Sequence, residues 1–442
     1  MNRILKDLSI MIRANLWLVP VLAALVTALF YFVAPPPPMH ATMSTGAAGG
    51  GYALFGEKLK AELAKEGFEL KLINSSGSRE NAERLLDENS GVNLALMQSG
   101  QELDMTLQER KALYNLGAIY QEPLWLFSRS GIYINTLNDL LALRTAVGSN
   151  QGGIRMVVDP LLQANKYDSQ ELPEQWQTYS GKKALTQLLN NELDAAFFLG
   201  SAESALIKEA ASHPELQLVS FNQAAAYRAR LPFLSQIEVP QGLLNLATNQ
   251  PHQDIVTLGP AAMLMANENF HPALTALILA AAQEVMSAGT LIDAPGTWPQ
   301  NFPHEFSTLT EAEYFHTKGL PLLQRYLPFR IASLADRYII LVIPLLMLLF
   351  PLFKVAGPIY RWRIRARIYR WYKYLRDVDQ RFNNFTLPEH IDEEIQRLHD
   401  LQEELAKVEV PLSYTNELYE LHLHVGFVLK RLQNLKAAHS TV

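Results

Sequence analysis

A glycine-rich turn at residues 43–56 (MSTGAAGGGYALFG) has the residue types that bind anions. Gly46, Gly49, Gly50 and Gly51 carry no side chains, so a ligand can approach the backbone closely there. The first amides of the helix that follows are unpaired and lie at the positive end of its dipole. The turn therefore predicts a binding place for a carboxylate or a phosphate. The alternative is a flexible glycine-rich loop after a linker.

Two further turns have the same character. Residues 74–83 (NSSGSRENAE) and 148–155 (GSNQGGIR) each follow an expected strand and precede an expected helix. Gln98 and Ser99 stand at the end of the apolar segment 92–98. Because ligands of α/β sheets bind at the carboxyl ends of the strands, these polar groups are expected to face a shared site.

The elements that position these turns alternate along the chain. Strand, polar turn and helix follow one another over residues 41–287, which is typical of a mainly parallel α/β sheet. The helix after the first turn is expected to carry Leu54, Leu59 and Leu63 on one face. Residues 116–128 form a pair of strands that is broken at a Glu-Pro dipeptide.

Two apolar runs predict membrane spans. Residues 16–34 carry no charge and are long enough to cross a hydrocarbon core of roughly 30 Å. A signal peptide is the alternative, but bulky aromatics and four prolines make a poor cleavage site. Residues 337–359 form a second span if Lys354 snorkels. Basic flanks at 3–13 and 361–376 then place both termini in the cytoplasm, and the main domain in the periplasm of a bacterial inner membrane.

The C-terminal segment is predicted to be helical. Residues 361–376 form a basic, aromatic helix that suits an anionic membrane surface. A later helix has apolar residues at three- and four-residue spacing, which indicates the seam of a helical hairpin or a coiled coil. That seam comprises Leu418, Leu421, Val425, Val428, Leu432 and Leu435.

Composition and missing motifs exclude several functions. A net charge of −6, with no basic patch in the central body, argues against nucleic-acid binding. The lack of cysteine excludes disulfides, thiolate catalysis and cysteine-ligated metals. No phosphate loop, serine-hydrolase elbow or zinc-protease motif is present. His422 and His424 adjoin the apolar seam, which favours a structural role. We therefore predict a protein that is not an enzyme and has no cofactor or metal.

Six motifs follow one another along the chain: STGAAGGGY, SSGSRENAERLL, LALMQS, YQEPLWLFSR, AVGSNQGGIR and DAAFFLG. In this order they resemble the TAXI family, the periplasmic solute-binding proteins of TRAP (tripartite ATP-independent periplasmic) transporters. The resemblance covers about residues 43–329 and implies a two-lobed, type II-like periplasmic-binding-protein fold that closes over a small organic acid. Carried over position by position, it implies the ligand-binding residues Thr45, Gly46, Gly50, Gly51, Tyr52, Ser76, Gly77, Ser78, Asn81, Gln98, Ser99, Gly152, Gly153 and Arg155.

In this interpretation Gln98 and Asn81 contact polar groups of the ligand, and Arg155 either pairs with its charge or braces the turn. The chain also departs from the family pattern. The third turn usually reads APGSGTR in the family, whereas this chain has SNQGGI at Ser149–Ile154. Hydroxyls are lost there, so one end of the ligand is expected to be held differently or not at all. Gly100 stands where the family usually has aspartate.

The predicted organisation is a cytoplasmic N-terminus (1–14), a first transmembrane helix (15–34), a proline-rich spacer (35–42), a solute-binding domain (43–330), a second transmembrane helix (337–359) and a cytoplasmic basic helix with a helical hairpin (360–442). Lobe 1 is expected at about 43–143 and 238–330, and lobe 2 at about 144–237. Two functions follow. The first is capture of a small organic acid (a carboxylate, amino acid or 2-oxoacid) for a TRAP permease. The second is a transmembrane receptor or scaffold whose hairpin self-associates or engages protein partners.

Overall fold

A computed structural model describes residues 20, 23–24, 27, 36–150, 152–169, 171–383, 390–407 and 415–439, with some side chains between 340 and 383 left out. The chain forms two compact units. One comprises residues 35–335, and the other comprises 1–34 with 336–442. The predicted N-terminus at 1–14, and all but four residues of the predicted first span at 15–34, lie outside the described residues.

The larger unit contains two lobes, each built on its own sheet, which confirms the predicted two-lobed α/β fold. In lobe 1 the strand order is β11-β4-β10-β3-β1-β2. The strands are β1 (His40–Ser44), β2 (Glu69–Ile73), β3 (Leu94–Gln98), β4 (Leu113–Gln121), β10 (Ile255–Asn267) and β11 (Ser307–Thr308). The helices are α3 (Gly51–Lys65), α4 (Ser78–Leu86), η1 (Gln101–Asp104), α5 (Leu107–Ala112), η3 (Pro272–Leu274), α10 (Thr275–Val285), α11 (Thr310–Lys318) and η4 (Leu323–Arg325).

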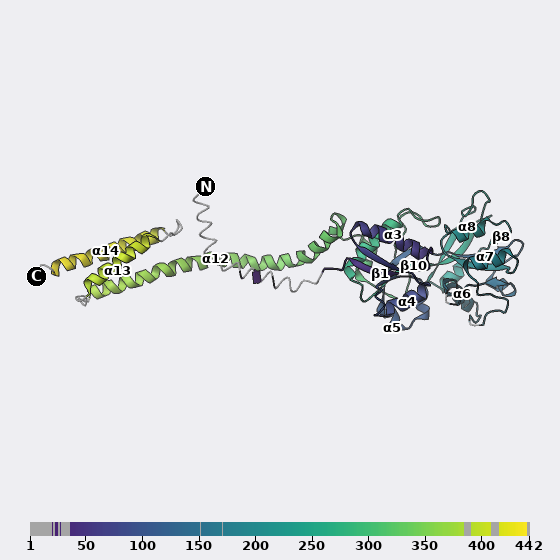
Figure 1. Cartoon of the computed structure of the whole chain (residues 1–442), viewed down its shortest axis with the longest axis horizontal. Coiled ribbons are helices and arrows are strands. Elements are labelled where there is room, and N and C mark those ends of the chain that lie inside the picture. The colour runs from purple at the N-terminus through teal and green to yellow at the C-terminus, as the bar shows by residue number, and fades with distance from the viewer. Residues whose placement is uncertain are drawn as a thin grey trace. The chain divides into compact units, whose positions relative to one another are not determined.

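Helices cover both faces of the lobe 1 sheet (Figure 1). On one face α3 packs with α10 and α11, and on the other α4 lies against β3. The buried face of α3 includes Phe55, Leu59 and Leu63, four residues apart in sequence. Leu54 is 57% exposed, so its predicted place on that face is wrong. The helical period turns Phe55 inward instead, because it precedes Leu59 by four residues.

Lobe 2 has the strand order β6-β7-β5-β8, with cores on both faces of its sheet. Along β7, Phe197 faces one core and Phe198 the other, as the alternation of strand side chains requires. The strands are β5 (Leu124–Arg129), β6 (Thr145–Ala146), β7 (Ala195–Leu199) and β8 (Leu216–Leu218), and β9 (Leu234–Val239) pairs with β10. The helices are η2 (Leu137–Ala142), α6 (Gly153–Ala164), α7 (Gly181–Leu189), α8 (Ala205–Ser212) and α9 (Ala224–Arg230).

The sheets are mixed, not mainly parallel as predicted. β1 pairs in parallel with β2 and β3, but β10 runs antiparallel to β3, β4 and β9. In lobe 2, β5 runs antiparallel to β7 and β8. The sequence pattern missed this because strands β5 and β10 join partners that are distant in sequence.

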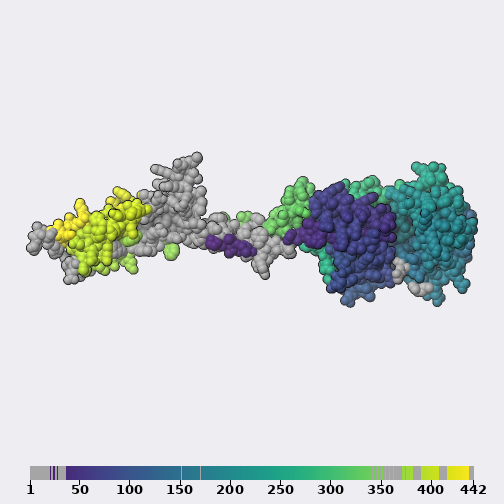
Figure 2. Space-filling view, in the orientation of Figure 1, coloured from purple at the N-terminus to yellow at the C-terminus, as the bar shows by residue number. Residues whose placement is uncertain are grey.

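Two stretches of chain connect the lobes, and they lie side by side. One is the break between β4 and β5 at Glu122 and Pro123, and the other is the middle of β10 at Pro260. The amide of Glu122 donates to the carbonyl of Pro260 at 2.9 Å. The crossings therefore fall near 122 and 260, and the predicted lobe boundaries at 143 and 237 differ because β5, β9 and the first half of β10 pack in lobe 2. Figure 2 shows the lobes as adjacent masses, lobe 2 in teal.

The second unit is helical where it is described. It contains most of α12 (Phe329–Asn383), with α13 (Ile391–Ala406) and α14 (Thr415–His439). α13 and α14 pack together, and Leu421, Val425, Val428 and Leu432 of the predicted seam are buried. The predicted second span, 337–359, lies within α12. Over the part of the chain that the structure describes, no helix is long and apolar enough to cross a membrane.

Candidate functional site

A cavity of about 320 Å³ lies between the two lobes of the larger unit. Its size suits a small organic ligand. Lobe 1 contributes Gly46, Ala47, Gly50, Gly51, Tyr52, Ser76, Gly77, Ser78, Gln98 and Glu122. Lobe 2 contributes Gly148, Ser149, Gly152, Gly153, Ile154, Ser180 and Leu199.

Four helices begin at this cavity, two from each lobe. Their N-cap residues are Gly50 for α3, Gly77 for α4, Gly152 for α6 and Ser180 for α7, and all four line the cavity. None of these N-caps makes a side-chain capping hydrogen bond. The first amides of each helix are therefore left for a ligand, at the positive ends of four helix dipoles.

Two of the glycines are required by geometry. Gly77 has φ of 132°, a conformation that residues with a side chain rarely adopt. At Gly153 a Cβ would stand 2.9 Å from the side-chain amide of Gln98 in the opposite lobe. A side chain at position 153 would therefore hold the lobes apart or displace Gln98.

The lobe 1 wall carries a buried polar cluster centred on Glu122. Its Oε2 accepts a hydrogen bond from the hydroxyl of Tyr52 at 3.1 Å and one from Nε2 of Gln98 at 3.2 Å. Ser78 joins the cluster, because its Oγ lies 3.3 Å from the Tyr52 hydroxyl and accepts a hydrogen bond from the backbone amide of Gln98 at 2.9 Å. Burial raises the pKa of Glu122 to about 7, against the lowering effect of the two hydrogen bonds. Burial also raises the pKa of Tyr52.

Two polar atoms near this cluster are buried without a hydrogen-bond partner among the described residues. They are Oε1 of Gln98 and the hydroxyl of Tyr120. The Gln98 side chain lines the cavity, whereas the Tyr120 hydroxyl lies beside the backbone of Gly51. Because a buried polar group without a partner is costly, Gln98 Oε1 marks a position where a ligand or water can donate a hydrogen bond.

Ten of the predicted ligand-binding residues line this cavity: Gly46, Gly50, Gly51, Tyr52, Ser76, Gly77, Ser78, Gln98, Gly152 and Gly153. The three glycine-rich turns therefore do converge. The other four predicted residues do not line the cavity; they are Thr45, Asn81, Ser99 and Arg155.

Asn81 is fully buried behind the cavity wall, which corrects its predicted contact with the ligand. Its Oδ1 accepts from Ser44, and its Nδ2 donates to the carbonyls of Thr45 and Leu96, each at 2.6 Å. Thr45 is also fully buried, and its Oγ1 donates to the carbonyl of Ile73. These side chains join β1, β2, β3 and α4, and their polar atoms are used within the fold.

Ser99 and Arg155 are likewise held elsewhere. The hydroxyl of Ser99 donates to the carbonyl of Phe233 at 2.7 Å and accepts from the amide of Ala261, so it ties lobe 1 to lobe 2. Arg155 pairs with Asp159 at 2.7 Å and donates to the carbonyl of Ser169. Of the two roles considered for Arg155, this geometry matches the brace.

The structure adds cavity residues that the sequence interpretation missed. The sequence pattern indicates only a break between two strands at Glu122. A carboxylate between two apolar strands is nevertheless a signal of a buried functional group. Ser149 and Ser180 supply hydroxyls on the lobe 2 wall. The third turn therefore keeps a hydroxyl despite its departure from the family pattern.

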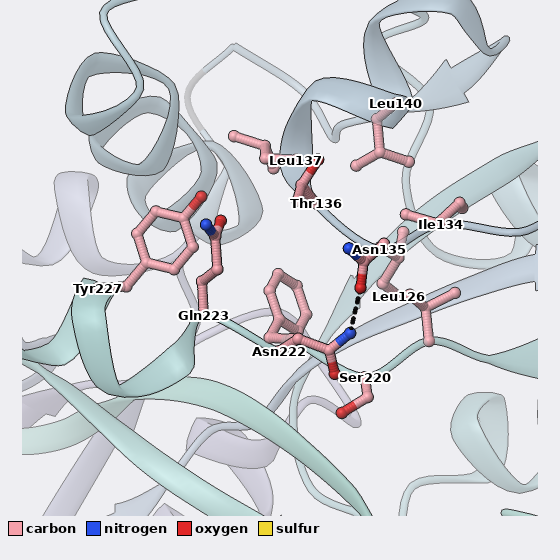
Figure 3. Close-up of a pocket in the computed structure, with 12 residues that line it drawn as sticks. Leu126, Ile134, Asn135, Thr136, Leu137, Leu140, Ser220, Asn222, Gln223 and Tyr227 are labelled. Atoms are coloured by element: carbon pink, nitrogen blue, oxygen red, sulfur yellow. Dashed lines mark hydrogen bonds between the residues drawn. The ribbon is translucent and has the colours of Figure 1, made fainter.

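A second pocket in lobe 2 is too small to be the site (Figure 3). It holds about 20 Å³, room for roughly one water molecule. Asn222 donates to Asn135 at 2.7 Å at its edge, and apolar side chains such as Leu126 and Leu140 form much of the lining.

Comparison with known families identifies the larger unit. The model of the NMT1-like family matches residues 43–284, more than half of the chain, including every turn that lines the cavity. The chain belongs to the NMT1-like family. Its finer assignment to the TAXI family stays a prediction. No curated protein sequence matches this NMT1-like chain.

Solved structures of binding proteins are similar to this NMT1-like chain at low identity. A TctC solute-binding protein from Polaromonas is 16% identical with a TM-score of 0.37, over 58% of this chain and 86% of that one. MatC from Rhodopseudomonas palustris with bound malate is 13% identical with a TM-score of 0.38, over 68% and 96%. The substrate-binding protein of an amino acid ABC transporter is 12% identical with a TM-score of 0.34, over 57% and 95%. These values carry no argument about the ligand of this chain.

Proposed function

We propose that this protein is a solute-binding protein that captures a small organic acid between its two lobes. One observation carries the proposal: four helix N-termini without side-chain caps meet at a single cavity. Each N-terminus carries about half a positive charge and several free amides. Such amides accept carboxylates as well as phosphates, and the resemblance to the TAXI family favours a carboxylate.

Closure of the lobes follows from the same geometry. Because two of the four N-termini belong to each lobe, an acid bound to all of them holds the lobes together. The two adjacent crossings, at Glu122 and Pro260, are the places where the chain can bend. Binding then favours the closed arrangement by its contacts in both lobes.

The finer proposal is a membrane-anchored protein of the TAXI type that delivers the acid to a TRAP permease. It is supported by the apolar run at 16–34, by the basic flanks of both predicted spans and by the six ordered motifs. In this proposal the two-lobed unit is periplasmic, and both termini are cytoplasmic, in a bacterial inner membrane.

A thermal-shift screen of the full-length chain in mild detergent tests acid binding. The panel comprises L-malate, 2-oxoglutarate, pyruvate and L-glutamate, with the uncharged sugar glucose as the control. An acid present at about 100 times its dissociation constant stabilises the fold by about 2.7 kcal/mol, which gives a clear rise in melting temperature. A flat response to the whole panel, from a chain that melts cooperatively, would overturn the proposal.

A second candidate function, a scaffold, is favoured by one surface of α14. Tyr419, Leu423 and Phe427 are 64%, 58% and 64% exposed and lie four residues apart, so they form an apolar stripe. Gly426 lies in the same helix with open space around its Cα. A glycine inside a helix costs about 1 kcal/mol relative to alanine, so we propose that it admits a closely packed partner helix.

The partner that this surface fits is a second copy of α14 in antiparallel orientation. Pairing Leu423 with Phe427 of the other copy brings Glu420 opposite Lys430 twice, by symmetry. Sedimentation velocity of the full-length chain tests this. Glu420→Lys is expected to weaken dimerisation, and the charge-swapped double variant Glu420→Lys with Lys430→Glu is expected to restore it. A monomeric wild-type chain would overturn the scaffold proposal.

A further inference from the structure

The charge inventory of the cavity is unusual for an acid-binding site. Glu122 is the only aspartate, glutamate, lysine, arginine or histidine among the residues that line it. The nearby guanidinium of Arg155 is already paired with Asp159 and lines a different cavity. The only full charge that the described lining can offer is therefore negative, although four helix N-termini favour an anion.

Among the described residues around Glu122 there is no compensating cation. The titratable groups that face it are Tyr52 from α3 and Tyr120 from β4. Gln98 of β3 donates to the carboxylate and Ser78 of α4 contacts the Tyr52 hydroxyl, while the carbonyl of Pro260 in β10 accepts from the backbone amide of Glu122. Neutral donors alone support the carboxylate, and burial favours its protonated form, with a pKa of about 7.

A bound carboxylate makes the ionised form of Glu122 still less favourable. Both groups would lie in the same cavity of about 320 Å³, and the buried position of Glu122 strengthens their repulsion. A protonated Glu122 removes that repulsion and gains an O–H donor that can face the ligand. Its Oε2 is occupied by Tyr52 and Gln98, while no hydrogen bond to Oε1 is present among the described residues.

We propose that the cavity binds its acid together with one proton, which Glu122 holds, so that Glu122 selects acids with a hydrogen-bond acceptor next to the carboxylate. The proton comes from solvent and returns to it on release. This inference rests on the proposed function, because it requires that an acid binds at the four helix N-termini. Glu122 also forms part of a crossing between the lobes, so its protonation and lobe closure involve the same residue.

Two consequences follow from linkage. Binding above the pKa of Glu122 takes up close to one proton, because the free site is ionised and the bound site is not. The affinity for the acid then falls about tenfold between pH 6 and pH 8. A ligand whose ammonium group faces Glu122 would behave oppositely, and its binding would strengthen as the pH rises.

Calorimetric titration of the full-length chain tests the proposal with 2-oxoglutarate, L-malate, pyruvate and L-glutamate as probes. Titrations at pH 7.8 in HEPES and in Tris, which differ in ionisation enthalpy and contain no phosphate to compete for the helix N-termini, give the protons taken up per acid bound. We expect close to one for the wild type and none for Glu122→Gln, whose affinity should no longer change between pH 6 and pH 8. The matched control is Glu102→Gln, a buried carboxyl with a raised pKa outside the cavity, which should keep the uptake.

The outcomes separate the two claims. Binding without proton uptake, or uptake that survives in Glu122→Gln, overturns the proton inference and leaves acid binding intact. Binding that strengthens from pH 6 to pH 8 also overturns it, because Glu122 would then act as an ionised acceptor. A folded chain that binds none of the four probes overturns the proposed function and this inference with it.

Discussion

The two walls of the cavity are built differently. Lobe 1 presents side chains that are tied into its interior, with Glu122, Tyr52, Gln98 and Ser78 in one hydrogen-bonded cluster. Lobe 2 presents backbone amides at two helix N-termini and the hydroxyls of Ser149 and Ser180. Both walls suit an anion, but only lobe 1 has an ionisable group in the lining.

This difference separates two kinds of effect. Changes on the lobe 1 wall alter the fold as well as the site, because the same atoms serve both. Removal of a serine hydroxyl from the lobe 2 wall is expected to alter ligand affinity alone, because the helices there begin without side-chain caps. Stability and affinity measured on the same variants therefore test whether the two walls differ in this way.

The largest expected effect is on the pH dependence of stability and comes from Glu122→Gln. The pKa of Glu122 is raised from 4.5 to about 7 in the folded state, so the folded chain holds a proton that the unfolded chain loses first. The stabilising contribution of Glu122 is therefore fully present below pH 4.5 and is lost as the pH rises to 7. Denaturant unfolding should show the wild type losing about 3 kcal/mol relative to Glu122→Gln between pH 4.5 and pH 8. Parallel pH profiles would contradict this.

Asn81→Ala should lower the free energy of unfolding by about 2 to 3 kcal/mol, nearly as much as the effect of Glu122. The substitution leaves the carbonyls of Thr45 and Leu96 buried without the amide that they accept from. Chemical unfolding measures the loss, and Asn89→Ala, at an exposed position, is the matched control with a change below about 0.5 kcal/mol. Because Asn81 lies behind the wall, the acid affinity of the folded variant should be unchanged. A large loss of affinity at full stability would restore Asn81 as a ligand contact.

Gln98→Ala should lower the affinity for the acid by about tenfold, the value of one or two buried hydrogen bonds. The variant removes both the unpartnered Oε1 and the donor to Glu122. Titration calorimetry at pH 6 and pH 8 measures the change. Unaltered affinity at both values would show that the lobe 1 wall does not contact the ligand through this side chain.

Ser180→Ala, on the lobe 2 wall, should have the smallest effect, an affinity loss of about threefold. Its hydroxyl lines the cavity but makes no capping hydrogen bond, so the melting temperature should stay within one or two degrees. A drop in stability without a change in affinity would reverse the comparison between the walls.

Much of this arrangement could be predicted from local signals. Glycine-rich turns after strands place backbone at the cavity wherever they occur, so the turns at 43–56, 74–83 and 148–155 were found from the sequence. The fold class followed from the alternation of strands and helices. The antiparallel pairing of β10 and β5 could not be predicted, because it joins segments far apart in the chain.

Within the site, the direction of each side chain could not be predicted from the sequence. Asn81 and Gln98 are both amides near glycine-rich turns, yet one satisfies backbone carbonyls inside the lobe and the other faces the cavity. Residue type does not distinguish these environments. The protonation state of Glu122 depends on its burial and on hydrogen bonds from Gln98 of β3 and Tyr52 of α3, so no single sequence window contains the information.

Acid binding at the helix N-termini is tested most directly by a crystal structure of the protein with the panel acid that binds most tightly. We expect carboxylate oxygens to lie about 2.8 to 3.0 Å from backbone amides at the helix N-termini, with at least one N-terminus from each lobe. An acid bound elsewhere, or one that occupies the cavity with its carboxylate directed to solvent, would contradict it.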